Sequence, residues 1–390
     1  MKENPLLKLE GFGQSIWMDF IRRGTIASGE LKQLIEEDGL SGVTSNPSIF
    51  EKAIADSHDY DDAIRKLALE GKSVDQIYTA LTVEDIQRVA DLFRPVYDRL
   101  DGADGFVSLE VSPYLARDTA KTIADARRLW VAVARPNVMI KVPATLEGLP
   151  AIQQLIGEGI NVNITLLFGL PRYRQVAEAY IAGLETLAAQ GKPLKSVASV
   201  ASFFLSRIDV LLDPMLEKTT ATDKSKAQVA ATFHGEVAIL SAKAAYQIYQ
   251  EIFDSERFGK LKAQGARTQR LLWASTSTKN PAYSELKYVE ALIGPETVDT
   301  IPLETLAAYR DHGKPASRLS SDAVKAAGTL RRLSEVGIDL DAATQQLEDE
   351  GIEKFVKAFD QLMNTLKEKR VAALREPVSG LGIDSGGAGD

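Results

Sequence analysis

The chain has 390 residues, of which 45 % are hydrophobic and 26 % charged, with a formal net charge of −8. This composition predicts a globular protein with a large core, and its acidic balance argues against a nucleic-acid partner. The absence of cysteine excludes disulfides and thiolate catalysis and favours a reducing compartment. No apolar run is long enough for a membrane span, and Met1-Lys2-Glu3-Asn4-Pro5 lacks the hydrophobic region of a signal peptide, so we expect a cytoplasmic protein without a membrane partner.

Short apolar runs alternate with helical patterns along most of the chain. The predicted strands are Ser15–Phe20, Leu40–Thr44, Gly105–Val111, Val138–Pro143, Ile160–Thr165, Ser196–Ser202, Arg270–Ser275 and Thr297–Ile301. Helical patterns occupy Gly29–Glu37, most of Phe50–Arg99, Arg117–Val133, Gly148–Glu158, Pro171–Gln190, Thr222–Phe253 and Ser320–Leu374. Within the second of these regions, Thr82-Val83-Glu84-Asp85 resembles a capping box and predicts a helix start.

Eight strands that alternate with helices predict an α/β fold of the (β/α)8 TIM barrel type with additional C-terminal helices. A doubly wound open sheet is the alternative, but no Gly-x-Gly-x-x-Gly follows any strand. We expect one barrel domain over residues 1–376, including appended helices at about 320–374. Residues 377–390 are rich in glycine and predict a flexible tail or linker. The position of the appended helices is open: they could close the barrel bottom, cover its mouth or face a partner.

One lysine stands in an otherwise apolar strand. In Val138–Pro143 the odd and even positions face opposite ways, so Met139 and Lys141 share one face. The simplest interpretation is a lysine at a strand end whose amine reaches water. The other interpretation is a buried amine, kept partly neutral, that attacks a carbonyl and forms a Schiff base. The second holds only if other strands bring polar partners to the same place.

Such partners are expected at the carboxyl ends of the strands, where barrel enzymes place their active sites. Alternation turns Asp19, Glu110, Lys141, Asn163 and Thr165 inward, and Asn46, Ser202 and Ser275 lie at or just beyond strand ends. Each has a local explanation as well: Asp19 as a helix cap, Asn46 as a turn residue, Thr165 as a β-branched strand residue. Their coincidence at one end of separate strands favours a site.

The residue types in this set suit aldol chemistry. A neutral amine attacks a ketose carbonyl, a carboxylate removes a proton from the hydroxyl next to the bond that breaks, and the iminium accepts the electrons. Burial lowers the pKa of a lysine while neighbouring carboxylates raise it, and the sequence leaves open which prevails. This chemistry needs no metal or cofactor, and His58, His234 and His312 are too scattered to form a ligand cluster.

The motifs around these residues resemble those of the transaldolase family, in its longer bacterial type. The resemblance is carried by Asp19, Thr44-Ser45-Asn46-Pro47-Ser48, Glu110, Lys141 in Ile-Lys-Val-Pro-Ala-Thr, the run Gly159–Phe168, and Ser202–Arg207. It covers about Ser15 to Ile301 and implies that Lys141 forms the Schiff base. It also implies that Asp19 is the acid/base group, that Glu110 and Thr165 relay protons, and that Asn46, Asn163 and Ser202 hold substrate hydroxyls.

The phosphate end of the site departs from the family pattern. The resemblance assigns Arg207 to the phosphate, but the shorter members carry a second arginine in Ala-Ser-Phe-Arg after strand seven. Here the run is Ala274-Ser275-Thr276-Ser277-Thr278-Lys279-Asn280, so Ser275 and Lys279 are the candidates to complete the phosphate site. Lys279 would act as a point charge rather than a fork. The residue after Ser202 is Phe203, where the shorter members have proline.

The resemblance implies a transaldolase of the pentose phosphate pathway, which moves a dihydroxyacetone unit from sedoheptulose 7-phosphate to glyceraldehyde 3-phosphate and yields erythrose 4-phosphate and fructose 6-phosphate. One alternative is a fructose 6-phosphate aldolase that releases free dihydroxyacetone; Ser202 and Phe204 argue against it, because that subfamily usually has tyrosine at the position of Phe204. Another is a non-catalytic barrel scaffold. The resemblance makes sugar phosphates the expected partners. Because some longer transaldolases are fused to a glucose-6-phosphate isomerase, it also implies fusion or association with that enzyme, with the glycine-rich tail after Pro377 as the start of a linker.

Overall fold

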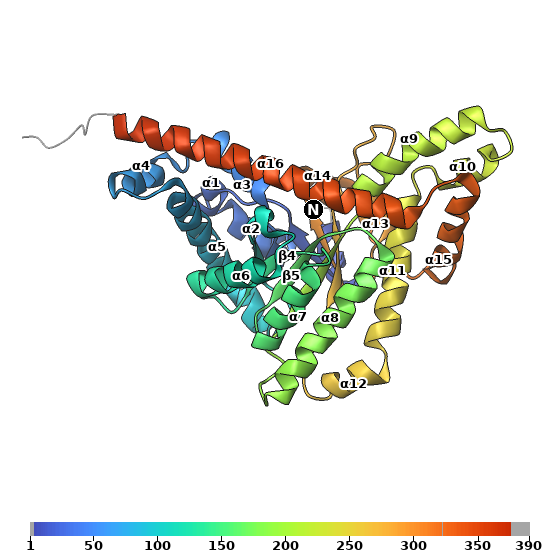
Figure 1. The fold of residues 1–390 in the computed structure, drawn as a ribbon, viewed down its shortest axis with the longest axis horizontal. Helices are drawn as coiled ribbons and strands as arrows, with labels where there is room; N and C mark the ends of the chain where they lie inside the picture. The colour runs from blue at the N-terminus through green and yellow to red at the C-terminus, as the bar shows by residue number, and fades with distance from the viewer. Residues whose placement is uncertain (1–3, 322, 376–390) are drawn as a thin grey trace, which may run out of the picture.

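Eight parallel strands close into a barrel in the computed structural model, which describes residues 4–321 and 323–375 (Figure 1). Each strand pairs with its sequence neighbours and β1 pairs with β8, so the predicted (β/α)8 barrel is confirmed. The strands are β1 Gln14–Met18, β2 Gly42–Val43, β3 Phe106–Glu110, β4 Val138–Pro143, β5 Val162–Leu167, β6 Ser199–Phe204, β7 Arg270–Ala274 and β8 Thr297–Ile301.

Helices surround the barrel and cover its outward-facing apolar side chains. They are α1 Arg23–Ala27, α2 Glu30–Asp38, α3 Pro47–Ala55, α4 Asp61–Leu69, α5 Val74–Arg99, α6 Thr119–Val133, α7 Gly148–Glu158, α8 Leu170–Ala189, α9 Ser206–Thr222, α10 Ala227–Phe233, α11 Val237–Phe253, α12 Glu256–Lys262, α13 Lys287–Ala291, α14 Leu303–His312, α15 Ala323–Arg331 and α16 Leu340–Arg375. Short 3-10 turns lie at Pro5–Lys8, Glu10–Phe12, Pro113–Leu115 and Arg332–Val336. Among the described residues no helix is both long and apolar enough to cross a membrane.

The long helical region predicted over Thr222–Phe253 is interrupted. Thr222 is the last residue of α9, and α10 and α11 follow it, separated from each other at Gly235. Gly235 has a φ of +72°, which a right-handed helix cannot accommodate, and its N–H donates to the Asp213 carboxylate at 2.8 Å. The Gly235 N–H therefore bonds to a side chain distant in the chain instead of making an intrahelical backbone hydrogen bond.

The capping box predicted at Thr82 is also wrong. Helix α5 begins nine residues earlier, after Ser73. The Ser73 hydroxyl accepts from the Gln76 N–H at 3.2 Å, and the Gln76 side chain accepts from the Ser73 N–H at 3.0 Å. Thr82 lies inside the helix, and its hydroxyl donates to the carbonyl of Tyr78 at 2.9 Å.

Two strands begin and end later than predicted. Strand β6 starts at Ser199 and includes Phe204, and β5 starts at Val162 and reaches Leu167. Asn161 explains the late start, because its side chain donates to the carbonyl of Val138 at 3.1 Å and accepts from the Ala198 N–H at 2.9 Å. It thereby replaces ladder bonds at the lower ends of both strands.

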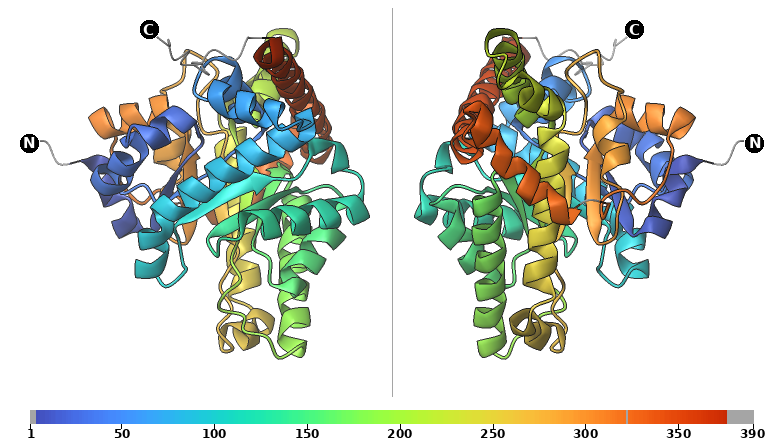
Figure 2. Two further views of the ribbon diagram at one scale, coloured as in Figure 1. Left: turned by 90° about the vertical axis from the view of Figure 1, so that its left-hand side faces the viewer. Right: turned by 90° about the vertical axis from the view of Figure 1, so that its right-hand side faces the viewer.

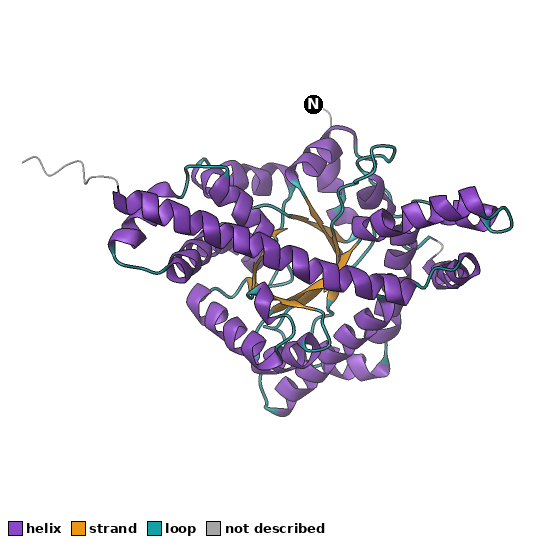
Figure 3. Cartoon of the chain, turned by 45° about the horizontal axis from the view of Figure 1, so that its top comes forward, coloured by secondary structure: helices purple, strands orange, loops and turns teal. Residues whose placement is uncertain are grey.

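Helix α16, the last of the appended helices, has a defined position on the barrel. It is the long red helix of Figure 1, and Figure 2 places it at the end of the molecule opposite α12. In Figure 3 it crosses in front of the strands, and it packs against α3, α4, α5, α9 and β5. The appended helix therefore covers the barrel mouth. The tail predicted for residues 377–390 lies outside the described residues.

The lower half of the barrel interior is filled by an aromatic and polar layer. The Trp17 indole N–H donates to Asp104 at 2.8 Å, and Asp104 also lies 3.4 Å from the guanidinium of Arg270. Gly42 on β2 faces the Trp17 ring so closely that an added Cβ would lie 2.5 Å from ring atoms. The hydrogen bond to Asp104 and the ion pair of Asp104 with Arg270 hold the Trp17 ring in place, so the ring cannot move away from an added Cβ at residue 42.

We predict that Gly42→Ala destabilises the fold by about 1–3 kcal/mol through overpacking against Trp17. Urea unfolding of the two proteins measures the difference. Gly259→Ala is the control: no atom lies within 4 Å of its added Cβ, and alanine favours the helix. Equal unfolding midpoints for Gly42→Ala and the unchanged protein would contradict the packing account.

Candidate active site

A cavity of about 170 Å³ lies at the carboxyl ends of the strands, beneath α16. Eight of the eleven side chains expected at the site line it; they are Asp19, Asn46, Lys141, Ser202, Phe204, Arg207, Ser275 and Lys279. The other three are buried in the barrel wall on the strands next to β4: Glu110 and Asn163 stand beside Lys141, and Thr165 beside Pro143. All eleven expected residues therefore come from the same end of the barrel.

Lys141 is buried at the centre of this arrangement, with 4 % of its surface exposed. Its Nζ donates to the carbonyl of Ser45 at 2.9 Å and lies 3.4 Å from Oε2 of Glu110. Strand register produces the second contact, because Glu110 on β3 stands directly beside Lys141 on β4. The amine therefore does not reach out to water as a surface lysine would.

The two carboxyl groups near the amine hold their protons more tightly than ordinary carboxylates. Burial raises the pKa of Glu110 to about 7, although Lys141 opposes this shift by favouring the charged form. Burial also raises the pKa of Asp19, again against the opposing effects of Lys141 and of a hydrogen bond from Thr44. Near neutral pH, Glu110 can therefore both donate and accept a proton.

A row of hydrogen bonds runs from β3 through β5 to β6. The Asn163 amide donates to the Ser108 hydroxyl at 3.0 Å and accepts from the Ser202 hydroxyl at 2.7 Å. This row fixes the orientation of the Asn163 side chain. Thr165, two residues further along β5, has a buried hydroxyl without a hydrogen-bond partner among the described residues. Such a group is available to a ligand or a water molecule.

Asn46, in the loop after β2, caps a helix and also lines the cavity. Asn46 is the N-cap of α3, and its side-chain oxygen accepts from the Ile49 N–H at 3.0 Å. The same residue lines the cavity. Its amide nitrogen carries the donors that remain for a substrate hydroxyl.

Asp19 is positioned by its backbone and by a threonine. Its N–H donates to the carbonyl of Ile301 at 2.9 Å, and its carboxylate accepts from the Thr44 hydroxyl at 2.7 Å. The Thr44 hydroxyl in turn lies 2.8 Å from that of Thr300. Neither threonine was among the expected site residues, although Thr44 belongs to the loop motif that was.

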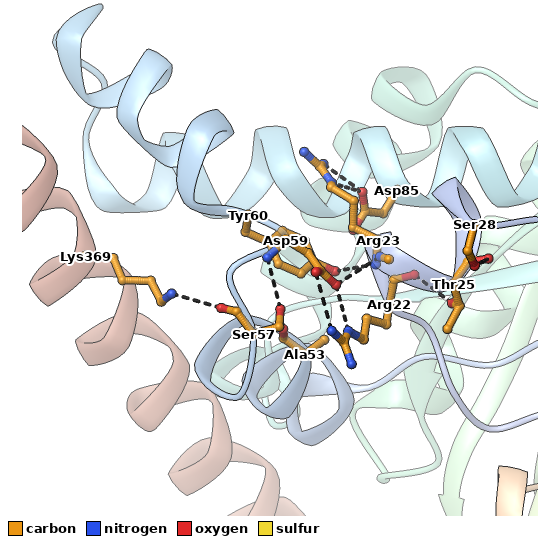
Figure 4. Close-up of polar contacts among 11 residues, drawn as sticks. Arg22, Arg23, Thr25, Ser28, Ala53, Ser57, Asp59, Tyr60, Asp85 and Lys369 are labelled. Atoms are coloured by element: carbon orange, nitrogen blue, oxygen red, sulfur yellow. Dashed lines mark hydrogen bonds and ion pairs between the residues drawn. The ribbon is translucent and has the colours of Figure 1, made fainter. Parts of the chain in front are cut away.

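Ion pairs hold the loop that follows Asp19. Arg22 donates to Asp59 at 2.7 Å and Arg23 to Asp85 at 2.8 Å, which joins this loop to α5 and to the segment before α4 (Figure 4). Asp85 is fully buried, so removal of Arg23 would leave an uncompensated buried charge. These ion pairs therefore hold the segment directly after Asp19 against α5 and the segment before α4.

Cationic groups gather at one side of the cavity. Arg207 lies with its Cζ 5.8 Å from the Phe204 ring centre, and its buried Nη1 has no hydrogen-bond partner among the described residues. Ser275, at a φ of +55°, is 2.8 Å from Ser206 through the two hydroxyls. Lys279 is exposed at the rim and donates to the Ser277 hydroxyl. Two cations and two hydroxyls on one side suit an anionic ligand group.

Phe355 of α16 also lines the cavity, and the sequence analysis missed it. Its apolar neighbours Leu347, Gly351 and Leu362 recur at helical spacing, so the pattern marks only a buried helix face. Nothing in that pattern distinguishes a residue packed on the core from one over the barrel mouth. The described residues contain no group of three or more His, Asp or Glu side chains placed to hold a metal ion.

Known proteins resemble this chain over most of its length. The family described as Transaldolase/Fructose-6-phosphate aldolase matches residues 16–366, which extends through most of α16. The chain is 48 % identical to a protein named Transaldolase from Trichodesmium erythraeum, over 95 % of this chain and 98 % of that protein. It is 47 % identical to Transaldolase 2 of Nostoc punctiforme (95 % and 98 %) and 46 % identical to Transaldolase of Saccharopolyspora erythraea (93 % and 96 %).

The raised pKa of Glu110 predicts how stability changes with pH. The folded protein keeps this proton up to about pH 7, whereas an unfolded glutamate loses it near 4.5. The stabilising contribution is therefore present below about pH 4.5 and is lost as the pH rises toward 7. Glu110→Gln has no proton to lose. The free energy of unfolding of this variant, relative to that of the unchanged protein, should therefore rise by up to about 3 kcal/mol between pH 4.5 and pH 7.

Urea titrations at several pH values measure this difference. Glu158→Gln is the control, because Arg127 holds the pKa of Glu158 below its usual range. Its contribution is lost as the pH falls, so the relative stability of this variant should not rise with pH. A difference for Glu110→Gln that stays constant with pH would show that the carboxyl does not keep its proton in the folded protein.

Proposed function

This chain belongs to the transaldolase/fructose-6-phosphate aldolase family, and from that premise we propose that it transfers a three-carbon dihydroxyacetone unit through a Schiff base on Lys141. The proposed donor is sedoheptulose 7-phosphate or fructose 6-phosphate, and the acceptor is an aldose phosphate. The observation that carries the proposal is the buried Lys141 amine, 3.4 Å from a carboxyl whose pKa lies near neutral pH.

The prediction of an enzyme of aldol chemistry is confirmed by the family match, and that of a transaldolase by relatives of that name at 44–48 % identity. The roles of single residues, the sugar partners and the pathway stay proposals. The same holds for a cytoplasmic location and for association with a glucose-6-phosphate isomerase.

Formation of the Schiff base would use Lys141, Glu110 and Thr165. The neutral amine attacks the ketose carbonyl, and loss of water from the carbinolamine leaves an iminium. Glu110, with a pKa of about 7, would supply the proton that departs with the hydroxyl. The unpaired Thr165 hydroxyl would hold the water molecule through which this proton moves.

Carbon–carbon cleavage would use Asp19. Its carboxylate would remove the proton from the hydroxyl next to the bond that breaks, while the iminium accepts the electron pair as an enamine. Thr44 orients the carboxylate by its hydrogen bond at 2.7 Å. Burial raises the pKa of Asp19, which makes the group a stronger base than a solvent-exposed aspartate.

The remaining side chains would orient the substrate. Asn46 and Ser202 line the cavity and would bind hydroxyls of the transferred unit, and Asn163, buried behind Ser202 and bonded to it, would act with them. Arg207, with its unpaired buried Nη1, would bind the phosphate together with Ser275 and Lys279. An arginine gives a two-pronged contact and a lysine a point charge, so Arg207 would supply most of the orientation.

The alternative of a fructose 6-phosphate aldolase is less favoured. Residue 204 is phenylalanine, it lines the cavity, and its ring carries no hydroxyl to activate a water molecule there. The relatives quoted above are named transaldolase rather than aldolase. A non-catalytic scaffold would not need a buried lysine beside a protonatable carboxyl, which costs folding energy.

Borohydride trapping tests this function. Incubation with fructose 6-phosphate and borohydride should leave a reduced three-carbon adduct on Lys141, located by peptide mass mapping. Addition of erythrose 4-phosphate should remove most of the adduct, because the acceptor takes the unit away. Lys141→Arg, which keeps a cation but not a nucleophilic amine, is the matched control and should give no adduct.

The other outcomes are also informative. An adduct on Lys141 with steady release of free dihydroxyacetone, even when acceptor is present, would assign the aldolase activity instead. A folded protein that gives no adduct, or an adduct that persists in Lys141→Arg, would refute Lys141 as the nucleophile.

A further inference from the structure

We propose that Phe355 of α16 shields the covalent intermediate on Lys141 from bulk water, and so favours transfer of the three-carbon unit over its hydrolytic release. This inference rests on the function proposed above. It gives α16 a part in the reaction, although the helix comes after the last strand and contributes none of the expected site residues.

The position of Phe355 is the first observation. It lines the same cavity as Lys141, Asn46 and Arg207, although it is about 150 residues further along the chain than Arg207. Only 4 % of its surface is exposed. Its ring therefore closes the cavity from the helix side.

The chemistry of the lining is the second observation. The strands and loops contribute mostly hydroxyl, amide and charged groups, all of which attract water. Phe355 and Phe204 are the large apolar side chains described on the lining. Phe204 belongs to the barrel, so Phe355 is the apolar group that α16 adds.

The close packing of α16 on the barrel is the third observation. Gly351, one turn before Phe355, lies so close to β5 that an added Cβ would be 2.8 Å from Cδ2 of Leu166. Leu166 has a φ of +54° at the point where the register of β5 with β6 shifts, directly after Thr165. The helix thus packs on the irregular segment that carries a proposed proton-relay residue.

Ion pairs on several sides hold the helix in this place. Glu348 lies 3.3 Å from Arg172, and both side chains are about nine-tenths buried. Further along the helix, Lys369 donates to Asp61 at 2.6 Å and to the carbonyl of Ser57, the contact drawn in Figure 4. Contacts at both ends fix α16 across the mouth, so Phe355 is held over the cavity rather than placed there by a single bond.

Water decides the fate of the intermediate. After cleavage the enamine on Lys141 can attack the acceptor aldehyde, which forms the new carbon–carbon bond. Alternatively it takes a proton on carbon to become an iminium, and addition of one water gives dihydroxyacetone and the free lysine ammonium. Transfer also uses one proton, on the new alkoxide, and one water, which frees the product from Lys141, but the water acts only after the new carbon–carbon bond has formed. Release instead needs a proton on carbon and a water molecule at the three-carbon unit itself. An apolar ring over the cavity slows the second route more than the first.

The experiment compares release with transfer in variants of one helix. Release is measured as free dihydroxyacetone formed from fructose 6-phosphate alone, and transfer as sedoheptulose 7-phosphate formed when erythrose 4-phosphate is added. The variants are Phe355→Ala and the milder Phe355→Leu, which keeps an apolar side chain and protects the test if alanine prevents folding.

Phe359→Ala is the matched control. Phe359 lies one turn further along α16 with 9 % exposure, so its removal takes the same ring from the same helix. Its ring packs edge-to-face on Tyr78 at 5.2 Å and lines a different cavity, between α5 and α6, whose lining includes Glu110 but not Lys141. It therefore reports the effect of a loosened helix and of a ring lost near Glu110, without removal of a ring from the cavity that Lys141 lines.

We expect the ratio of release to transfer to rise roughly tenfold in Phe355→Ala, to rise less in Phe355→Leu and to stay unchanged in Phe359→Ala. An unchanged ratio in both Phe355 variants would overturn the inference, and so would an equal rise in Phe359→Ala. Borohydride trapping on the unchanged protein separates the two proposals. An adduct on Lys141 with an unchanged ratio refutes only the shielding role, whereas no adduct refutes the proposed function and this inference together.

Discussion

A buried lysine amine beside a buried carboxyl group is the interaction on which the rest of this structure depends. Lys141 and Glu110 lie 3.4 Å apart inside the barrel, where desolvation of two charges costs several kcal/mol unless neighbours compensate. The protein lowers that cost in two ways. The amine donates to the carbonyl of Ser45, and the carboxyl keeps a proton up to about pH 7. Because the carboxyl of Glu110 exchanges its proton near neutral pH, it is suited to proton transfer beside the amine.

Strand register places further polar side chains beside this pair. Glu110, Lys141 and Asn163 are direct neighbours on three adjacent strands, and parallel pairing places them at the same height in the barrel. Asp19 and Asn46 enter from the ends of β1 and β2, and Arg207 from the start of α9. Helix α16 then closes the mouth above them. A site that no single segment encodes is thus assembled by the closure of the barrel.

The sequence was sufficient for those features that strand alternation controls. The period of two turned Glu110, Lys141 and Asn163 to one side, and eight strand–helix units imply a closed barrel with the polar groups at one end. Features set by contacts distant in the chain were not predictable. Asn161 replaces ladder bonds of two strands, Gly235 ends a helix through Asp213, and Phe355 reaches the site from the last helix. In each case the local pattern is the same as that of an ordinary strand or helix.

The most direct test of the central claim is a crystal structure of Asp19→Asn soaked with fructose 6-phosphate. Because this variant lacks the base for cleavage, the account predicts that the intact sugar accumulates as an iminium on Lys141. Its phosphate should lie against Arg207, its C4 hydroxyl should point toward residue 19, and its chain should lie beneath Phe355. A sugar bound without a bond to Lys141, or with its phosphate away from Arg207, would contradict the arrangement described here.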